Sequence, residues 1–350
     1  MDPIAQLSDL CRAVGDDLLL VQGGGGNGSV KAGNRMWIKA SGVRMADVGS
    51  GTGHCGLDLA GLRAGQPLPQ TPPRPSMEWA LHAALGPVVL HTHPVFTNAF
   101  ACMADGRAAL TQALGQEPVW LDFCAPGPEL AAGLGRLVAE FQQQNRHLPE
   151  HVVLANHGLV ASGASVAAVL QTTGRLTRAA QQWFGALPDD ALSMQPPDPK
   201  LQTWADGLQA ALARRGHPQL AVRPAPHVTL TRAAAEPERW LRAGPLVPDD
   251  VVFGASGAHV VEPSLPPDNW LESMGNIHTT MLIAVRGLGV VLTASSGGTL
   301  RATAENLLAH VLIRRLVARR GEVQPLAPAA VAAILGMEAE TYRQSVAAAI

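Results

Sequence analysis

The chain has 350 residues and a formal net charge of −2; 47% of its residues are hydrophobic and 15% are charged. This length exceeds one typical domain, so we expect two. The apolar content excludes an intrinsically disordered chain. The nearly balanced charge argues against nucleic-acid binding, which would need a basic stripe.

The cysteines and the N-terminal residues predict a cytoplasmic protein. The four cysteines follow no disulfide spacing and form no C-x-x-C pair, which is typical of free thiols in a reducing compartment. The N-terminus lacks a basic-then-apolar signal pattern, and no apolar run is long enough to span a bilayer. We therefore expect no membrane association.

The first motif along the chain is a glycine run, Gly23–Gly28. Its spacing formally satisfies the dinucleotide-binding fingerprint G-x-G-x-x-G, which requires a helix to follow. The next residues, Ser29–Lys39, instead predict a hairpin with its turn at Gly33-Asn34. A dinucleotide site is therefore not expected, although backbone amides exposed by the glycines can cradle a substrate anion.

The segment Pro75–Leu85 predicts a short helix. Pro75 and Ser76 are typical of a helix start, and Glu78, Leu81 and Leu85 recur at helical spacing. A first-turn carboxylate at Glu78 can bind a metal, transfer a proton, or do both. It can equally complement the helix dipole, and the spacing alone leaves these alternatives open.

The most informative segment is an apolar run, Val88–Leu90, that ends in His91-Thr92-His93. Strand side chains alternate between faces, so His91 and His93 point the same way and can hold one ion. His157 follows a second apolar run, Val152–Ala155. Three neutral imidazoles with an open coordination position are typical of a catalytic zinc site. A structural interpretation suits the histidines with no site around them: His217, His227, His259.

Four motifs in this order resemble the class II aldolase/adducin family, which includes fuculose- and rhamnulose-phosphate aldolases and ribulose-phosphate 4-epimerase. The resemblance spans about residues 5 to 190. The motifs are Gly25-Gly26-Asn27-Gly28-Ser29, Lys39-Ala40-Ser41-Gly42, Ser76-Met77-Glu78, and His91-Thr92-His93-Pro94 with Asn156-His157-Gly158.

The resemblance implies a role for each motif. His91, His93 and His157 would bind a divalent metal, most often Zn²⁺, with Mn²⁺ or Co²⁺ as alternatives, and Glu78 would be the acid/base that also touches it. A phosphate or its equivalent would be held by Asn27, Gly28, Ser41, Gly42 and Ser76. Lys39 either meets the same anion or is a solvated lysine.

Two departures from the family pattern affect the expected chemistry. Met77 stands where phosphate-binding members often have a second serine, which removes one hydroxyl donor. Several members use a tyrosine near the site, and the only tyrosine here is Tyr342, near the C-terminus. The group that protonates the aldehyde oxygen is therefore unassigned.

Prolines between residues 186 and 200 predict a boundary, which gives an aldolase-like domain at 1–192 and a second domain at 200–350. In the second domain we expect helices at Leu201–Arg215 and Leu300–Arg319 and strands at Val251–Phe253 and Met281–Val285. The expected strand–turn–strand–helix order resembles the order around His157 in the first domain, and Arg286 stands where His157 would be. This resemblance indicates that the second domain is a degenerate copy of the first. The Val247–Phe253 phrase also resembles the middle region of bifunctional aldolase–dehydrogenases.

We therefore predict an α/β protein whose three-layer first domain has a central, mainly antiparallel sheet. The resemblance implies a metal-dependent lyase that cleaves a hydroxylated ketone, ketose phosphate or hydroxy-keto acid through a metal-stabilised enediolate. An epimerase or decarboxylase using the same site, and a non-enzymatic adducin-like binding module, are the alternatives. The expected partners are a small, anionic substrate and further copies of the chain, as a dimer or tetramer; nucleic acid is not expected.

Overall fold

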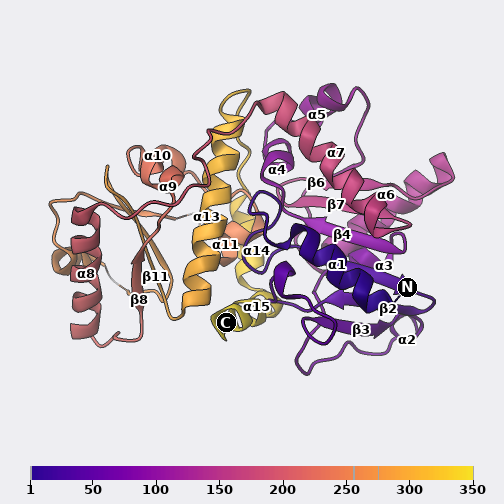
Figure 1. The fold of residues 1–350 in the computed structure, drawn as a ribbon, viewed down its shortest axis with the longest axis horizontal. Coiled ribbons are helices and arrows are strands. Elements are labelled where there is room, and N and C mark those ends of the chain that lie inside the picture. The colour runs from indigo at the N-terminus through magenta and orange to yellow at the C-terminus, as the bar shows by residue number, and fades with distance from the viewer. Residues whose placement is uncertain (1, 255–256, 275, 350) are drawn as a thin grey trace.

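The structure is a computed structural model that describes residues 2–254, 257–274 and 276–349. Two sheets lie on either side of a long central helix (Figure 1). The first sheet has the strand order β3-β2-β1-β4-β7-β6-β5, and only its β5–β6 pair is parallel. Its strands are β1 Asn27–Ala32, β2 Arg35–Lys39, β3 His54–Asp58, β4 Val88–Thr92, β5 Trp120–Leu121, β6 His151–Leu154 and β7 Gly158–Gly163.

Helices cover both faces of the first sheet, which confirms the predicted three-layer α/β fold. Alternation along β4 sends Val88 and Leu90 into a core with α1 (Pro3–Gly15) and α7 (Val166–Phe184). Val89 faces the opposite core, under α3 and α6. His91 therefore leaves the sheet on the α3 side. The other elements of this part are η1 Met45–Asp47, α2 Leu59–Arg63, α3 Trp79–Ala83, α4 Val95–Ala101, α5 Gly106–Leu114 and α6 Pro128–Asn145.

A second, smaller sheet follows, in the order β8-β11-β10-β9. Helices α8 and α12 pack on one face, and α9, α10 and α13 on the other. The elements are α8 Pro199–Arg214, β8 Ala221–Pro224, α9 Val228–Ala233, α10 Pro237–Trp240, α11 Pro248–Val252, β9 His259–Val261, α12 Pro267–Ser273, β10 Met281–Val285, β11 Gly289–Ala294, α13 Gly297–Val317, α14 Pro328–Leu335 and α15 Glu338–Ala349.

The second sheet repeats the arrangement of β4–β7. The two sets are β4–β7 and β8–β11. In each set the first strand pairs antiparallel with the fourth, and the fourth pairs antiparallel with the third. The third strand pairs in parallel with the second. The helix after the fourth strand begins at an N-cap serine with nearly the same backbone angles, Ser165 or Ser296. Each hairpin turn contains a residue in the left-handed conformation, Asn156 or Gly287. Its N–H donates to the C-terminal end of the helix that follows the first strand of the set, α4 or α9. The two units thus share local topology and capping.

The strand register corrects the predicted place of Arg286. Gly158 and Gly289 begin the equivalent strands β7 and β11. The residue before each glycine is therefore equivalent, so Leu288, not Arg286, occupies the position of His157. The sequence comparison failed because the two hairpin turns differ in composition while their strands keep the same pairing.

Helix α13 belongs to both units. Its residues Leu308, Leu312 and Leu316 pack with α4, α5 and α7 of the first unit, whereas Leu307 and Val311 pack over the second sheet. Burial on nearly every face explains why the helix lacks the polar stripe of a surface helix. The two units therefore share one continuous apolar contact through α13, visible at the centre of Figure 1.

Most predicted elements are present. The β1–β2 hairpin, α8, β10 and α13 lie where the sequence predicts them. The strand predicted at Val251–Phe253 is wrong: the segment is α11, Pro248–Val252. Pro248 at the first position and two aspartates in the first turn are helix-start signals that outweigh a short apolar run. The helix predicted at Pro75–Leu85 is reduced to α3, with Glu78 at its N-cap.

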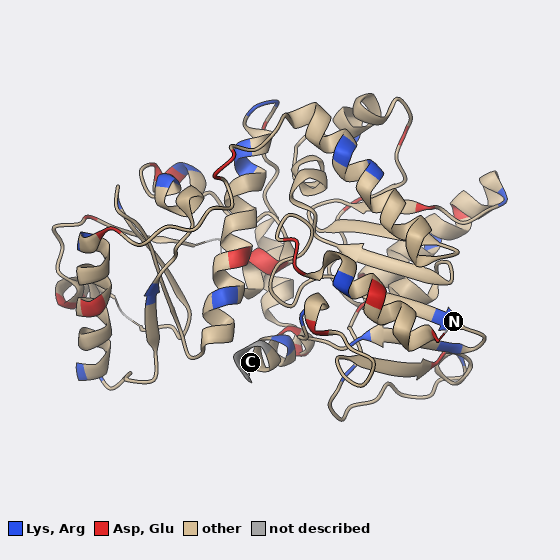
Figure 2. Cartoon of the chain, viewed as in Figure 1, with Lys and Arg blue, Asp and Glu red and all other residues tan. Residues whose placement is uncertain are grey.

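Charged residues are few and spread singly over both units, with acidic and basic groups interspersed (Figure 2). A search of the described residues finds no helix both long and apolar enough to cross a membrane. Residues 185–198, where the sequence predicts the domain boundary, connect α7 to α8.

Candidate metal centre

Three imidazoles that are far apart in the sequence meet beneath the glycine loop. His91 lies near the end of β4, His93 follows that strand, and His157 lies in the β6–β7 turn. Their ring centroids are 4.9 to 5.5 Å apart, and one nitrogen of each lies within 4.8 Å of the others. All three are buried. The fold therefore brings together the three histidines that the sequence nominates as ligands.

A hydrogen bond fixes the direction of the His91 ring, and a carboxylate lies close to the ring of His93. His91 Nδ1 lies 3.1 Å from the Leu159 carbonyl oxygen, and His93 Nδ1 lies 2.9 Å from Asp249 Oδ2. Because both neighbours are acceptors, we assign each proton to Nδ1, which leaves the Nε2 lone pairs free. These two Nε2 atoms are only 3.1 Å apart, so their lone pairs face each other. A cation between them would remove the repulsion, and imidazole nitrogen suits zinc.

Burial keeps His91 in the form that a metal requires. Burial is the main cause that lowers the pKa of His91 to about 3, with smaller contributions of both signs from its neighbours. The imidazole is therefore neutral at neutral pH and needs to lose no proton before it binds an ion.

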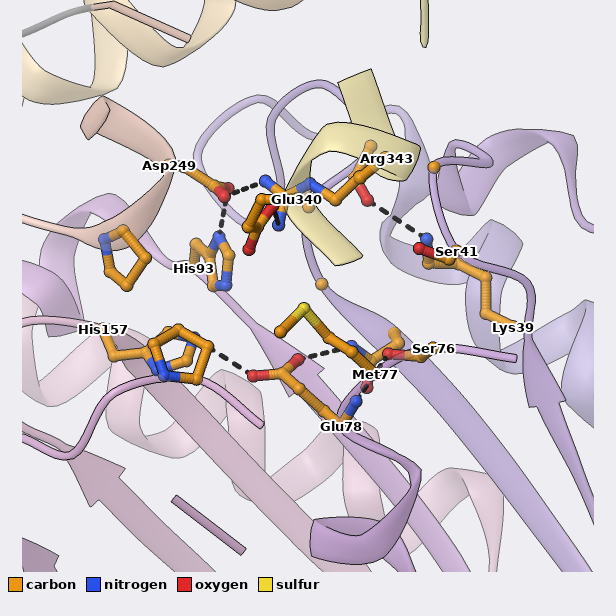
Figure 3. Close-up of a pocket in the computed structure, with 17 residues that line it drawn as sticks. Lys39, Ser41, Ser76, Met77, Glu78, His93, His157, Asp249, Glu340 and Arg343 are labelled. Atoms are coloured by element: carbon orange, nitrogen blue, oxygen red, sulfur yellow. Dashed lines mark hydrogen bonds and ion pairs between the residues drawn. The ribbon is translucent and has the colours of Figure 1, made fainter. Parts of the chain in front are cut away.

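Glu78 completes the cluster from the opposite side (Figure 3). Its Oε1 lies 3.3 Å from His157 Nε2, and its Oε2 lies 3.6 Å from His91 Nε2. Oε1 is buried, and among the described residues no donor meets it with hydrogen-bond geometry. Burial raises the pKa of Glu78, but the two imidazoles and the Asn27 amide together bring it well below its usual value. The carboxylate is therefore ionised.

A chain of buried hydrogen bonds orients Glu78. Asn27 Nδ2 donates to Glu78 Oε2 at 2.8 Å, and Asn27 Oδ1 accepts a short hydrogen bond from His82 Nε2. His82 Nδ1 then accepts from the Ser29 hydroxyl, 2.8 Å away. His82 is fully buried, and the donor–acceptor order makes it a neutral imidazole. The sequence places His82 at helical spacing from Glu78 but assigns it no role.

The predicted anion-binding residues divide into two groups. Asn27, Ser41, Gly42 and Ser76 line the pocket beside Glu78. Gly28 does not: a Cβ built there would meet Cys11 on α1, so its free side faces the helix layer behind the sheet. Its role in binding the anion stays a prediction that can rest only on its backbone.

Lys39 lines the pocket, but its ammonium group is already engaged. It donates to the carbonyl oxygens of Gly24, Ala40 and Val43, at 3.1, 3.4 and 2.5 Å. Burial is the main cause that lowers its pKa to about 8. The lysine thus ties the glycine loop to the Ser41-Gly42 turn, and it is not the solvated lysine of the alternative interpretation.

Four pocket-lining residues come from the second unit, Pro248 and three charged residues, where the sequence assigns no site residue. Asp249 on α11 and Glu340 and Arg343 on α15 line the same cavity as Glu78 and His157 (Figure 3). Arg343 is paired with Asp249 and lies 3.4 Å from Glu340 Oε2. Helix α15 covers the pocket so closely that the cavity volume is about 30 Å³, room for about two water molecules.

The two departures from the family pattern also have defined positions. Met77 lines the pocket between Glu78 and Arg343 (Figure 3). Tyr342 lies on α15 and stacks against Arg74, whose guanidinium carbon is 4.3 Å from the ring centroid. Tyr342 is not among the described residues that line the cavity.

Comparisons with known proteins agree with this architecture. A curated relative from Bacillus subtilis (strain 168), described as the uncharacterized oxidoreductase YuxG, is 29% identical over 198 residues, which are 49% of this chain and 28% of that protein. The chain thus spans about a quarter of this relative's length.

Several solved structures are similar to about half of the chain. The N-terminal class II aldolase domain of a Thermoplasma acidophilum protein is 22% identical, with 52% of this chain and 93% of that chain covered and a TM-score of 0.45. An L-fuculose 1-phosphate aldolase is 20% identical, with 54% and 91% covered and a TM-score of 0.41. A Thermotoga maritima sugar-phosphate aldolase is 18% identical, with 53% and 97% covered and a TM-score of 0.42.

The decisive match is to a sequence family. The profile of the "Class II Aldolase and Adducin N-terminal domain" matches residues 5–184, about half of the chain, which contain the glycine loop, Glu78 and all three histidines. The chain belongs to the class II aldolase and adducin family.

Proposed function

We propose that this protein is a divalent-metal-dependent lyase that reversibly cleaves the C–C bond of a hydroxylated ketone carrying an anionic group. The observation that carries the proposal is the meeting of three buried imidazoles with an ionised Glu78 carboxylate 3.3 to 3.6 Å from two of them. Three imidazoles with one more oxygen donor leave coordination positions open for substrate oxygens.

His91, His93 and His157 would hold the ion; imidazole ligands favour zinc, with Mn²⁺ or Co²⁺ as alternatives. When bound, the ion supplies a Lewis acid that stabilises negative charge developing on the ketone oxygens. Glu78 would take up or deliver the proton at the carbon where the bond breaks, because its side chain lines the cavity beside the three imidazoles. Asn27 holds the carboxylate in place through Oε2.

The anionic end of the substrate would lie against the loops on the far side of Glu78. The Ser41 and Ser76 hydroxyls and the Gly42 amide are the donors available there. With Met77 in place of a hydroxyl, the site offers fewer donors to a phosphate than a double serine would. The proposed substrate classes are therefore a ketose phosphate and a hydroxy-keto acid, whose carboxylate would take the place of the phosphate.

The same ligand set could serve an epimerase or a decarboxylase, and product analysis separates these from an aldolase. An adducin-like binding module is the remaining alternative, and the intact histidines and Glu78 argue against it. We also propose the division into a catalytic domain at 1–192 and an accessory, degenerate copy at 200–350, supported by the repeated strand order.

The test is metal content after purification without added metal, followed by a cleavage assay on ketose phosphates and hydroxy-keto acids. We expect about one divalent ion per chain, lost in the double variant His91→Ala/His93→Ala. The matched control replaces two histidines outside the site, His147 and His217. Metal retained in the double variant, or none taken up by the native protein, would reject the proposal.

A further inference from the structure

The phrase Val247–Phe253, which the sequence singles out without a role, reaches into the metal centre from the second unit. It forms α11, and Asp249 in the first turn of this helix is only 1% exposed. Asp249 Oδ2 lies 2.9 Å from His93 Nδ1, and its Oδ1 is paired with Arg343 (Figure 3). The two oxygens of this buried carboxylate thus face different groups: Oδ1 pairs with Arg343, and Oδ2 lies at ion-pair distance from His93, a candidate metal ligand.

Asp249 is held by a second network that does not touch the pocket. The neighbouring Asp250 accepts from the Leu246 amide and from His310 Nδ1, both at 2.7 Å. Arg314 Nε donates to His310 Nε2 at 2.8 Å. This buried group, on α13, fixes the start of α11 and therefore the position of Asp249.

The same loop is tied to the hairpin that carries His157. Asn156 Nδ2 donates to the Leu246 carbonyl at 2.9 Å and to the Gln324 carbonyl at 2.7 Å. The position of α11 is therefore coupled to the turn between β6 and β7. Rigid support of this kind is what a side chain needs in order to orient another to within a fraction of an ångström.

The glycine loop is shaped to admit this contact. A Cβ built on Gly25 would lie 2.6 Å from Asp249 Oδ2 and 3.0 Å from His93 Nδ1. Any side chain at Gly25 would therefore displace one of the two. The glycine run thus serves the His93–Asp249 pair as well as the anion pocket.

We propose that Asp249 is a positioning residue of the metal centre: it accepts the Nδ1 proton of His93 and so directs Nε2 at the ion. The inference rests on the proposed metal-dependent function. A carboxylate behind a ligating imidazole fixes its tautomer and ring orientation and raises its basicity, and removal of such a carboxylate commonly weakens metal binding 10- to 100-fold. The accessory unit would then contribute to the centre without providing a ligand.

The experiment compares Asp249→Asn and Asp249→Ala with Asp206→Asn, a control on the exposed side of α8 and outside the pocket lining. Zn²⁺ affinity is measured by competition with a chromogenic chelator, and visible absorption of the Co²⁺ form reports the ligand geometry. Long-range ¹H–¹⁵N spectra of the metal-free native protein report which His93 nitrogen carries the proton. Circular dichroism establishes that each variant is folded.

We expect zinc affinity to fall about 10- to 100-fold in the Asp249 variants, more for Ala than for Asn, with an altered cobalt spectrum. The Asp206→Asn protein should keep the native affinity. Native zinc binding that is unchanged by Asp249→Ala would overturn the inference and leave the proposed function intact. If the native protein takes up no metal, the proposed function fails. The ¹H–¹⁵N spectra still test the positioning role in that case. A proton on His93 Nε2 would overturn this role, and a proton on Nδ1 would support it.

Discussion

The buried His82 predicts how the stability of this protein responds to acid. Both ring nitrogens of His82 are engaged, by Asn27 and Ser29, and burial is the main cause that lowers its pKa to about 3. In the unfolded chain the same group titrates near about 6.5. Below that pH the unfolded state binds a proton that the folded state refuses, so stability falls as pH falls.

The magnitude follows from the size of the gap. The His82 contribution is fully present above about pH 6.5 and is lost at about 1.4 kcal/mol per pH unit as the pH drops toward about 3. Between pH 7 and pH 5 this is a loss of about 2 kcal/mol from one side chain. Burial also lowers the pKa of His91 and His151, so the whole protein should lose more.

The assay isolates His82 by difference. Urea unfolding of the native protein and of His82→Gln at pH 7 and pH 5 gives four free energies of unfolding. Glutamine can still donate toward Asn27, so we expect a loss of about 1 kcal/mol at pH 7 and a pH dependence about 2 kcal/mol shallower than native. His147→Gln, on an exposed ring, is the matched control. Parallel pH profiles for native protein and His82→Gln would refute the argument.

Three further predictions concern packing and chemistry. Leu312→Ala removes a side chain on α13 that is 2% exposed in the core shared by the two units and should cost about 2–5 kcal/mol in urea unfolding; a loss well under 1 kcal/mol would mean that the units do not depend on this contact. Gly25→Ala should cost about 1–3 kcal/mol through its clash with Asp249, whereas Gly135→Ala, in α6 with open space around it, should stabilise by up to about 1 kcal/mol; equal effects would remove the close approach as the cause. Glu78→Gln should keep much of its metal while losing most turnover, and unchanged turnover would remove Glu78 from the mechanism.

The sequence could predict the ligand triad because local signals marked each member. His91 and His93 follow from strand periodicity after an apolar run, and His157 from a second such run. The ordered motifs then gave the family, and the profile match to residues 5–184 confirms it. What is local in the chain was predictable, including the β1–β2 hairpin that argued against a dinucleotide site.

The contribution of the second unit could not be predicted in this way. Asp249 and Arg343 meet His93 only after α13 has packed against both sheets, and no periodicity links residues so distant in sequence. The local clue to α11 is Pro248 followed by two aspartates, which mark a helix start, whereas the apolar run Val251–Phe253 favours the strand that the sequence predicts. Lys39 lies in the pocket lining, as its motif suggests. Its ammonium group, however, donates to backbone carbonyl oxygens, and a sequence does not show where those oxygens lie.

The span of the pocket along the chain has a consequence for biosynthesis. Its lining begins at Gly24 and ends at Arg343, so a ribosome must release the chain through Arg343 before the cavity can close. Until then the apolar side chains of α4 and α7 that await Leu308, Leu312 and Leu316 stay uncovered. The three histidines of the first unit would be synthesised before α13 and α15, and the apolar surface would meanwhile be exposed to chaperones. The pocket would be complete only after these helices pack against the first unit.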